Sequence, residues 1–189
     1  MDQRGTVERA RRGEHDAFAS LIDVHLARLD AAARLILRDP ELARDAVQEA
    51  LIRAWRDLPG LRDPDRFDAW LHRLLANACL DLVRRRKRRV IEVELTPIHA
   101  PRTDDVSGAL ADRQMLDQAL AALAPSHRAV VALHYLLGMP LSEVAASLRI
   151  PIGTAKSRLH YALAAMRSTV TAEPESESVR ATVAGGHLA

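Results

Sequence analysis

The chain has few of the residues that disulfide-linked, membrane-spanning or sheet-rich proteins use. It contains one cysteine in 189 residues, so no disulfide can form within it. Its apolar runs, such as Ala129 to Leu133, are far shorter than the roughly 20 residues that a membrane-spanning helix needs. Aromatic residues make up 3% of the sequence and glycines number 8, a balance that favours helices over sheets. These shortages predict an all-α protein that is not inserted in a membrane.

The N-terminal segment indicates a cytoplasmic location, and the single cysteine indicates a buried thiol. The opening residues, MDQRGTVERARRGEHD, are too polar for a secretory signal peptide. Cys79 lies within an apolar helical pattern, which favours a buried, inert thiol over a redox switch. We therefore expect a cytoplasmic protein.

Basic and acidic residues are segregated along the chain. The formal net charge is only +2, but residues 84–89 form an unbroken basic run, RRRKRR. The segment after residue 170 is mostly acidic. The basic run is either a nucleic-acid footprint or a solvated helix end, where cations are favourable, and the run alone favours neither.

Helical spacing of apolar residues predicts three helices in a first domain that spans residues 14–89. The first of these helices runs to Arg38. Asp39 and Pro40 then supply a cap and a first residue for the second helix. Prolines and a glycine punctuate a loop over residues 58–66, and a third amphipathic helix follows and ends in the basic run.

A second helical domain is predicted over residues 109–170. Pro125 is expected to stop one of its helices, and Ser126 is expected to cap the next. A very short helix from Leu141 to Leu148, a tight turn and a longer helix then form a helix-turn-helix candidate.

The segments around the second domain lack a lasting apolar period. Residues 90–108 contain prolines and small polar residues, which predicts a flexible linker. Residues 171–189 have little apolar content and are expected to be disordered. The expected architecture is two small helical domains joined by a flexible linker, the second being a helix-turn-helix domain.

The outward face of the second predicted helix carries an exposed isoleucine among acidic and amide groups. This combination indicates a protein-docking surface, although on the helix alone an isoleucine at the core edge with solvating acids is the better explanation. The segment ARDAVQEALIRAW, however, closely resembles the region of bacterial sigma factors that docks on the clamp helices of the polymerase β′ subunit. The resemblance implies core-polymerase-binding roles for Asp45, Gln48, Glu49 and Ile52.

Four polar residues are spaced to share one face of the third predicted helix, namely Arg73, Asn77, Asp81 and Arg84. Such a stripe can contact phosphates and base edges, and it can also be an intrahelical network in which Asp81 pairs with an arginine. The stretch RFDAWLHRLLANACLDLVRRRKRR is similar to the sigma segment that binds the minus ten promoter element. The resemblance implies that the DNA contacts there come from Arg73, Asn77, Asp81, Arg84, Arg85, Lys87 and Arg88.

The resemblance also implies a function for the loop over residues 58–66. In this family the loop helps to form a pocket for a base that leaves the duplex. Capture of the displaced strand by cationic and polar groups would then make opening favourable. The chain has no glycine-rich phosphate loop, so no ATP site is expected.

The second domain contains the most specific motif, LSEVAASLRIPIGTAKSRLHYAL. It resembles the helix-turn-helix with which sigma factors read the minus thirty-five element, and Lys156 and Ser157 are the best base-reading candidates. The family often carries arginine where Tyr161 stands. The residues implied to lie near the major groove or its phosphates are Thr154, Lys156, Ser157, Arg158, His160 and Tyr161.

Nothing in the sequence indicates an enzyme or a metalloprotein. The 8 histidines show no metal-ligand spacing with the cysteine, and the basic groups have an explanation without catalysis. We therefore expect no metal site, no cofactor and no catalytic residue. A helical nucleic-acid enzyme is a third, weaker hypothesis.

These patterns together favour a small sigma factor of the extracytoplasmic-function group. Such a protein binds core RNA polymerase through the β′ and β subunits, directs it to promoter DNA and promotes melting, and an anti-sigma factor is a further candidate partner. The alternative is a stand-alone helix-turn-helix regulator whose first domain senses a partner or ligand. That alternative does not explain the coexistence of the docking helix, the polar stripe and the basic run.

Overall fold

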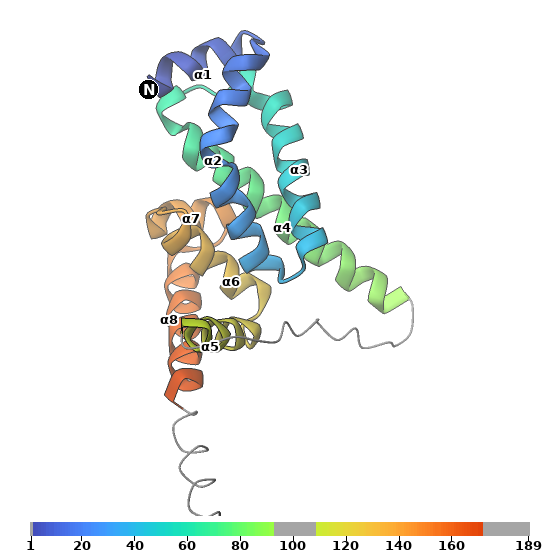
Figure 1. Cartoon of the computed structure of the whole chain (residues 1–189), viewed down its shortest axis with the longest axis vertical. Helices are drawn as coiled ribbons and strands as arrows, with labels where there is room; N and C mark the ends of the chain where they lie inside the picture. The colour runs from blue at the N-terminus through green and yellow to red at the C-terminus, as the bar shows by residue number, and fades with distance from the viewer. Residues whose placement is uncertain (1, 93–108, 172–189) are drawn as a thin grey trace, which may run out of the picture.

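A computed structural model describes residues 2–92 and 109–171, in which every regular element is helical (Figure 1). The all-α prediction is confirmed. Most of the predicted linker and tail, residues 90–108 and 171–189, lies outside the described residues. The α-helices are α1 Gln3–Arg11, α2 His15–Leu37, α3 Pro40–Asp57, α4 Phe67–Glu92, α5 Ala109–Ala121, α6 Pro125–Val131, α7 Leu141–Leu148 and α8 Ile152–Thr171. Short helical turns are η1 Leu58–Gly60, η2 Pro64–Arg66 and the π-helical η3 Ala132–Leu136.

The boundary between α2 and α3 follows directly from local sequence chemistry. Arg38 ends α2 in the left-handed conformation, with φ of 53°. The side chain of Asp39 accepts hydrogen bonds from the backbone N–H groups of Glu41 and Leu42, both at 3.1 Å. Pro40 occupies the first helical position, where no intrahelical N–H bond is lost. The predicted cap and start are therefore confirmed.

Helices α2, α3 and α4 pack side by side around the core of the first domain (Figure 1). Large side chains such as Leu29, Phe67 and Leu75 are completely buried there. Small residues fill much of the remaining contact between the helices and allow the backbones to approach closely. These fully buried alanines are Ala32, Ala33, Ala43, Ala46, Ala50 and Ala54.

The N-terminal segment, which the apolar pattern did not reveal as an element, forms helix α1. Val7 and Ala10 are buried between α1 and the rest of the domain. Arg4 pairs with Asp65 of η2 at 2.6 Å, and Gln3 donates a hydrogen bond to Asp68 of α4. Two buried positions are too few to give a readable helical period. Helix α1 therefore buttresses the segment that precedes α4.

The second domain contains helices α5 to α8, and one predicted cap in it is wrong. Ala124 precedes α6, Pro125 is its first residue, and Ser126 makes no capping bond. Proline fits this position because the first N–H groups of a helix have no intrahelical partner. The helix-turn-helix prediction is confirmed, since Arg149 in the left-handed conformation, with φ of 55°, ends α7 just before α8.

The two domains pack closely against each other, which the sequence pattern did not predict. Helix α2 contacts α6 and η3, and α4 contacts α6 and α7. Buried side chains of both domains, among them Ile36 and Leu133, belong to one continuous apolar core. The arrangement places α7 of the helix-turn-helix beside the N-terminal part of α4 (Figure 1).

Candidate polymerase and nucleic-acid interfaces

The predicted docking face of α3 is exposed in the structure. Asp45, Gln48 and Glu49 are exposed, and Ile52 keeps 54% of its surface open to solvent. Ile52 is therefore not a core-edge residue, and the explanation that treated it as one is wrong. A large apolar side chain held in solvent beside acidic groups is a feature of protein interfaces.

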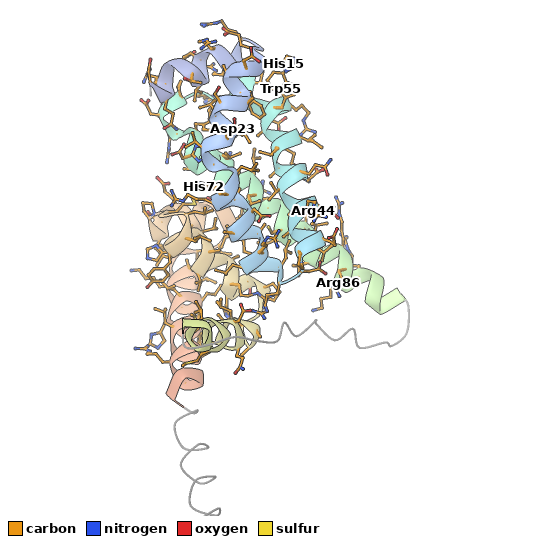
Figure 2. The ribbon with its side chains drawn as sticks, viewed as in Figure 1. His15, Asp23, Arg44, Trp55, His72 and Arg86 are labelled. Atoms are coloured by element: carbon orange, nitrogen blue, oxygen red, sulfur yellow. The ribbon has the colours of Figure 1, made fainter. Side chains whose placement is uncertain are left out.

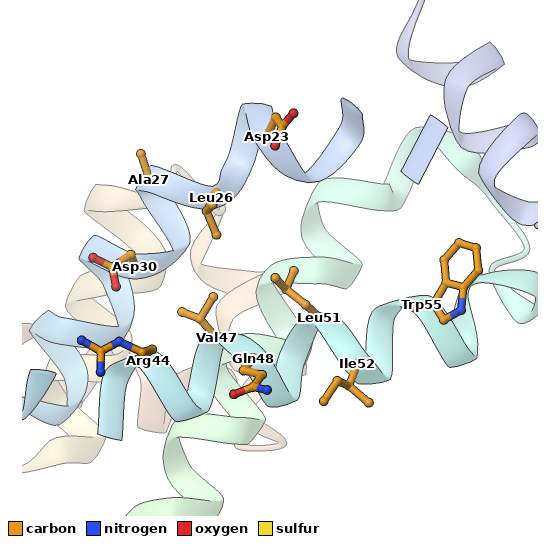
Figure 3. A pocket seen from close by; sticks show the side chains of 10 residues that line it. All are labelled: Asp23, Leu26, Ala27, Asp30, Arg44, Val47, Gln48, Leu51, Ile52 and Trp55. Carbon is orange, nitrogen blue, oxygen red and sulfur yellow. The ribbon is translucent and has the colours of Figure 1, made fainter. Parts of the chain in front are cut away.

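A groove of about 960 Å³ runs between α2 and α3 next to this face (Figure 3). Its floor and wall are apolar, with Leu26 from α2 and Leu51 and Trp55 from α3. Polar groups flank it, among them Asp30 and Gln48. The sequence pattern did not reveal that α2 forms one wall of this groove. Leu26 lies outside the buried face of α2 and is 42% exposed. A leucine outside the apolar helical pattern is the sequence feature that could have indicated this side of the groove.

Some residues of the polar stripe of α4 are exposed to solvent, and others belong to an ion-pair network. Arg73 and Arg84 are exposed, whereas Asn77 and Asp81 are half-buried. Asp81 accepts hydrogen bonds from Arg84 at 2.8 Å and from Arg53 of α3 at 3.4 Å. The predicted network within α4, in which Asp81 pairs with an arginine, is therefore present. Arg73 and Asn77 take no part in it.

Arg53 also extends this network to the docking face. Its Nε donates to Glu49 at 2.7 Å, while its guanidinium reaches Asp81 on α4. The side chain of Arg53 is only 22% exposed. One half-buried arginine therefore joins the predicted polymerase-binding and promoter-binding surfaces.

The basic run lies inside α4 and not at its end, because the helix continues to Glu92. The helix macrodipole acts only within the last turn, so it does not account for Arg84 or Arg85. Among the described residues, Arg85, Lys87 and Arg88 are exposed and form no ion pair. This part of α4 offers unneutralised positive charge.

The loop over residues 58–66 is held by its own apolar and capping contacts. Leu58, Leu61 and Pro64 are buried, and Asp63 accepts a hydrogen bond from the N–H of Asp65 at 3.1 Å. Its charged groups face outward. A hollow of about 450 Å³ lies beside the loop. Residues from both domains line it, including Arg62, Arg66, Trp70, Arg73, Met139 and Glu143.

Helix α8 presents most of its predicted DNA-reading residues to solvent. Lys156, Ser157, His160 and Tyr161 are exposed, whereas Thr154 and Arg158 are half-buried. Its opposite side holds the helix in the domain, because Ala155 and Ala162 are fully buried. The exposed set follows the helical period and forms one face.

Two buried titratable groups lie inside the first domain. Burial raises the pKa of the Cys79 thiol to about 12, so the prediction of a buried, inert thiol is confirmed. Burial, with the nearby His25, lowers the pKa of His72 to about 4. The side chain of His72 lies between helices in Figure 2, and its Nδ1 is buried without a hydrogen-bond partner.

The described helices contain neither a membrane-spanning segment nor a metal-binding group. No helix among them is long and apolar enough to cross a membrane. Within the same residues, no three histidine, cysteine, aspartate or glutamate side chains gather as a metal-binding group.

An all-α chain with an exposed apolar groove, a basic helix and a helix-turn-helix is typical of a DNA-binding protein that also engages a protein partner. Comparison with known proteins identifies the class. A family model for sigma-70 region 2 matches residues 21–89, and one for sigma-70 region 4 matches residues 113–166.

Curated relatives and solved structures agree with these matches. The ECF RNA polymerase sigma factor SigL of Mycobacterium tuberculosis is 36% identical over 168 residues, which cover 87% of this chain and 94% of SigL. The RNA polymerase sigma-E factor of Streptomyces coelicolor is 35% identical over 160 residues, covering 85% and 89% of the two chains.

Two solved complexes share the fold. CnrH in complex with the cytosolic domain of CnrY has a TM-score of 0.65 at 28% identity and covers 90% of this chain and 98% of CnrH. RpoE of Bartonella quintana in complex with the anti-sigma factor NepR has a TM-score of 0.66 at 25% identity and covers 82% and 98%.

The chain belongs to the extracytoplasmic-function group of the sigma-70 family. It is a transcription initiation factor that binds core RNA polymerase and directs it to promoter DNA. This membership decides against the stand-alone regulator. The predicted docking helix of the first domain, which that alternative left unexplained, lies within the matched sigma-70 region 2.

Proposed function

We propose that the α2–α3 surface of this sigma factor docks on the clamp helices of the β′ subunit. The observation that carries this proposal is the exposed Ile52 beside an apolar groove, with Asp45, Gln48 and Glu49 around it. An apolar centre with charged groups at its rim suits a protein partner, because burial supplies affinity and the charges supply orientation.

The proposed promoter-opening surface consists of the α4 stripe, the basic run and the loop over residues 58–66. Asn77 is half-buried, free of the Asp81 network and able to donate to and accept from a base edge. The unpaired cations farther along α4 suit phosphates of the displaced strand. The loop, braced by α1, would hold an extruded base.

The face of α8 that contains Lys156, Ser157, His160 and Tyr161 is proposed to read the minus thirty-five element in the major groove. Support comes from its exposure and from the buried alanines on the opposite side, which fix its orientation. Thr154 and Arg158 lie at the border of this face and suit phosphate contacts.

An anti-sigma factor is a proposed partner of the same first-domain surfaces. Two similar solved structures are complexes, and one of them contains a sigma factor bound to an anti-sigma factor, which supports the proposal. No metal, cofactor or catalytic step is needed for any of these roles, and a cytoplasmic location suits them.

Reconstituted transcription with core polymerase and a library of random promoters tests the proposed function. We expect the selected promoters to share two separate elements. Asn77→Ala should change the requirement for the downstream element, and Lys156→Ala that for the upstream one. Equal losses on all promoters in both variants would contradict the assignment of sequence reading to these helices.

A further inference from the structure

The hollow of about 450 Å³ beside the loop over residues 58–66 has walls from both domains. One wall consists of the loop and the N-terminal turns of α4, and the other consists of α7 with the segment just before it. A volume of this size falls within the range of small-molecule pockets. A single-stranded nucleic acid, in contrast, needs a continuous groove along its backbone. The hollow therefore suits one small molecule.

Buried contacts hold the two walls of the hollow in place. Met139 and Val144 of the second domain belong to the same apolar cluster as Leu71 of α4. Arg128 of α6, which is only 7% exposed, donates to the backbone carbonyl of Ile36 in α2 at 2.8 Å. A pocket between such walls is preformed, so little of the binding free energy is needed to order it.

Three arginines line the hollow, and two of them lack an acidic partner in the part of the chain that the structure describes. Arg62 of the loop and Arg73 of α4 are exposed and form no ion pair there. Arg66 pairs with Glu143 of α7 at 3.3 Å. Asp63, the other acidic residue of the lining, accepts a backbone N–H group of its own loop. The two unpaired guanidinium groups are suited to phosphate oxygens, which match the fork of donors that arginine presents.

An aromatic ring and a hydroxyl group also line the hollow. Trp70 of α4 is half-buried, and its ring packs against that of Phe67 with the centroids 5.9 Å apart. Phe67 is fully buried and so holds the indole in place. Ser147 of α7 is 5% exposed, and its hydroxyl makes no hydrogen bond within the described residues. An indole can stack on a planar base, and a hydroxyl can bond to a sugar or a base edge.

We propose that this hollow binds a free nucleoside diphosphate, whose base stacks on Trp70 and whose two phosphate groups pair with Arg62 and Arg73. A planar base joined to a compact anion uses both the aromatic and the cationic parts of the lining. A bare phosphate or an uncharged aromatic compound would use only one of them. The proposal does not depend on the proposed promoter-opening function, because α7, which forms one wall, has no part in that function.

Fluorescence titration of the full chain with ADP, GDP and UDP tests the proposal. The chain has two tryptophans, so Trp55→Phe in the α2–α3 groove leaves Trp70 as the reporter. We expect each nucleotide to quench Trp70 and to reach saturation at millimolar concentration or below. Adenosine and pyrophosphate each carry half of the ligand and should bind at least about tenfold more weakly than ADP. Equal affinities for pyrophosphate and ADP would reduce the hollow to an anion patch and overturn the proposal.

Removal of one arginine tests the cationic part of the site. Arg73→Gln should weaken ADP binding about tenfold, because it removes a charged donor to a phosphate. Arg85→Gln makes the same change at an exposed, unpaired arginine of α4 outside the hollow, and it should leave the affinity unchanged. Equal losses in the two variants would mean that ADP is attracted only by the general positive charge of α4.

A bulky substitution on α7 tests the location of the ligand. Ala146 is exposed and lines the hollow, so Ala146→Phe should remove ADP binding in calorimetry without changing the helical content in circular dichroism. The same substitution at the exposed Ala164 of α8 is the control. ADP binding that survives Ala146→Phe would overturn the assignment of the site. Quenching of Trp70 by an oligothymidylate and not by any of the three nucleotides would also overturn it, while transcription in the promoter-library assay would still support the proposed function.

Discussion

Because Arg53 pairs with some of the nearby acidic residues and not with others, substitutions of these residues should differ in how many surfaces they disturb. It bonds Glu49 on the docking face and Asp81 on the promoter-binding helix, so loss of either acid disturbs both surfaces. Asp45 is exposed and forms no ion pair within the part of the chain that the structure describes. Asp45 is therefore the cleaner probe of polymerase binding.

Asp45→Lys should weaken binding to core polymerase without changing the helical content. Loss of a desolvated charged contact costs on the order of 2 kcal/mol or more, about thirtyfold in affinity. Fluorescence titration with core polymerase measures the effect, with Glu8→Lys as a control outside the docking face. Wild-type affinity of Asp45→Lys would remove this residue from the interface.

Asn77→Ala should impair promoter opening more than initial duplex binding. The proposed partner of Asn77 is a strand that is exposed only during melting. Permanganate footprinting on duplex and pre-melted templates separates the two steps, and the pre-melted template should rescue the defect. A defect of the same size on both templates would contradict this role of Asn77.

At the scale of elements, α8 and the basic run of α4 should be separable because they meet different forms of DNA. Lys156→Ala or Ser157→Ala should reduce discrimination at the upstream element, since a base-edge contact contributes roughly 1–3 kcal/mol. Transcription from paired promoters, each altered in one element, measures this preference. A uniform loss with the upstream preference intact would mean that α8 only positions the protein.

Changes in the basic run should act on all promoters alike. Arg85→Gln combined with Arg88→Gln removes two exposed, unpaired cations and leaves Arg84 with Asp81. Binding should weaken nearly equally across promoters, and the slope of log affinity against log salt should fall by up to about one unit per lost phosphate contact. An unchanged slope in a salt titration would exclude these two residues from phosphate binding.

For the whole molecule, His72 makes stability depend on pH. Its pKa in the folded chain, about 4, lies below the unfolded value of 6.5, so the unfolded state binds more protons between these values. Stability is fully present above pH 6.5 and is lost as the pH falls toward 4. The loss from this group between pH 7 and 5 should be about 2 kcal/mol.

Urea denaturation at the two pH values measures this loss. His72→Leu should lose about 2 kcal/mol less than the wild type on acidification, because it removes the linked proton. The same change at the exposed His160 is the control. Identical pH dependence of the wild type and His72→Leu would show that His72 is protonated equally in both states.

Local chemistry was enough to predict most of the helices, although not α1, and much of their outward faces. The Asp39–Pro40 start of α3 depends only on neighbouring backbone groups, and the exposed faces of α4 and α8 follow from helical spacing. The family resemblance rests on the same local segments. These features of the sequence determined the fold class and the function as an initiation factor.

The tertiary structure decided what distant segments do to one another. Arginine is rarely fully buried, so nothing in the sequence marked Arg128 as a residue of the domain interface. Leu26 became part of a groove, and Val7 became part of a core, because residues of other helices pack beside them. Such contacts depend on the shapes of complete surfaces, which a periodic pattern along one helix does not contain.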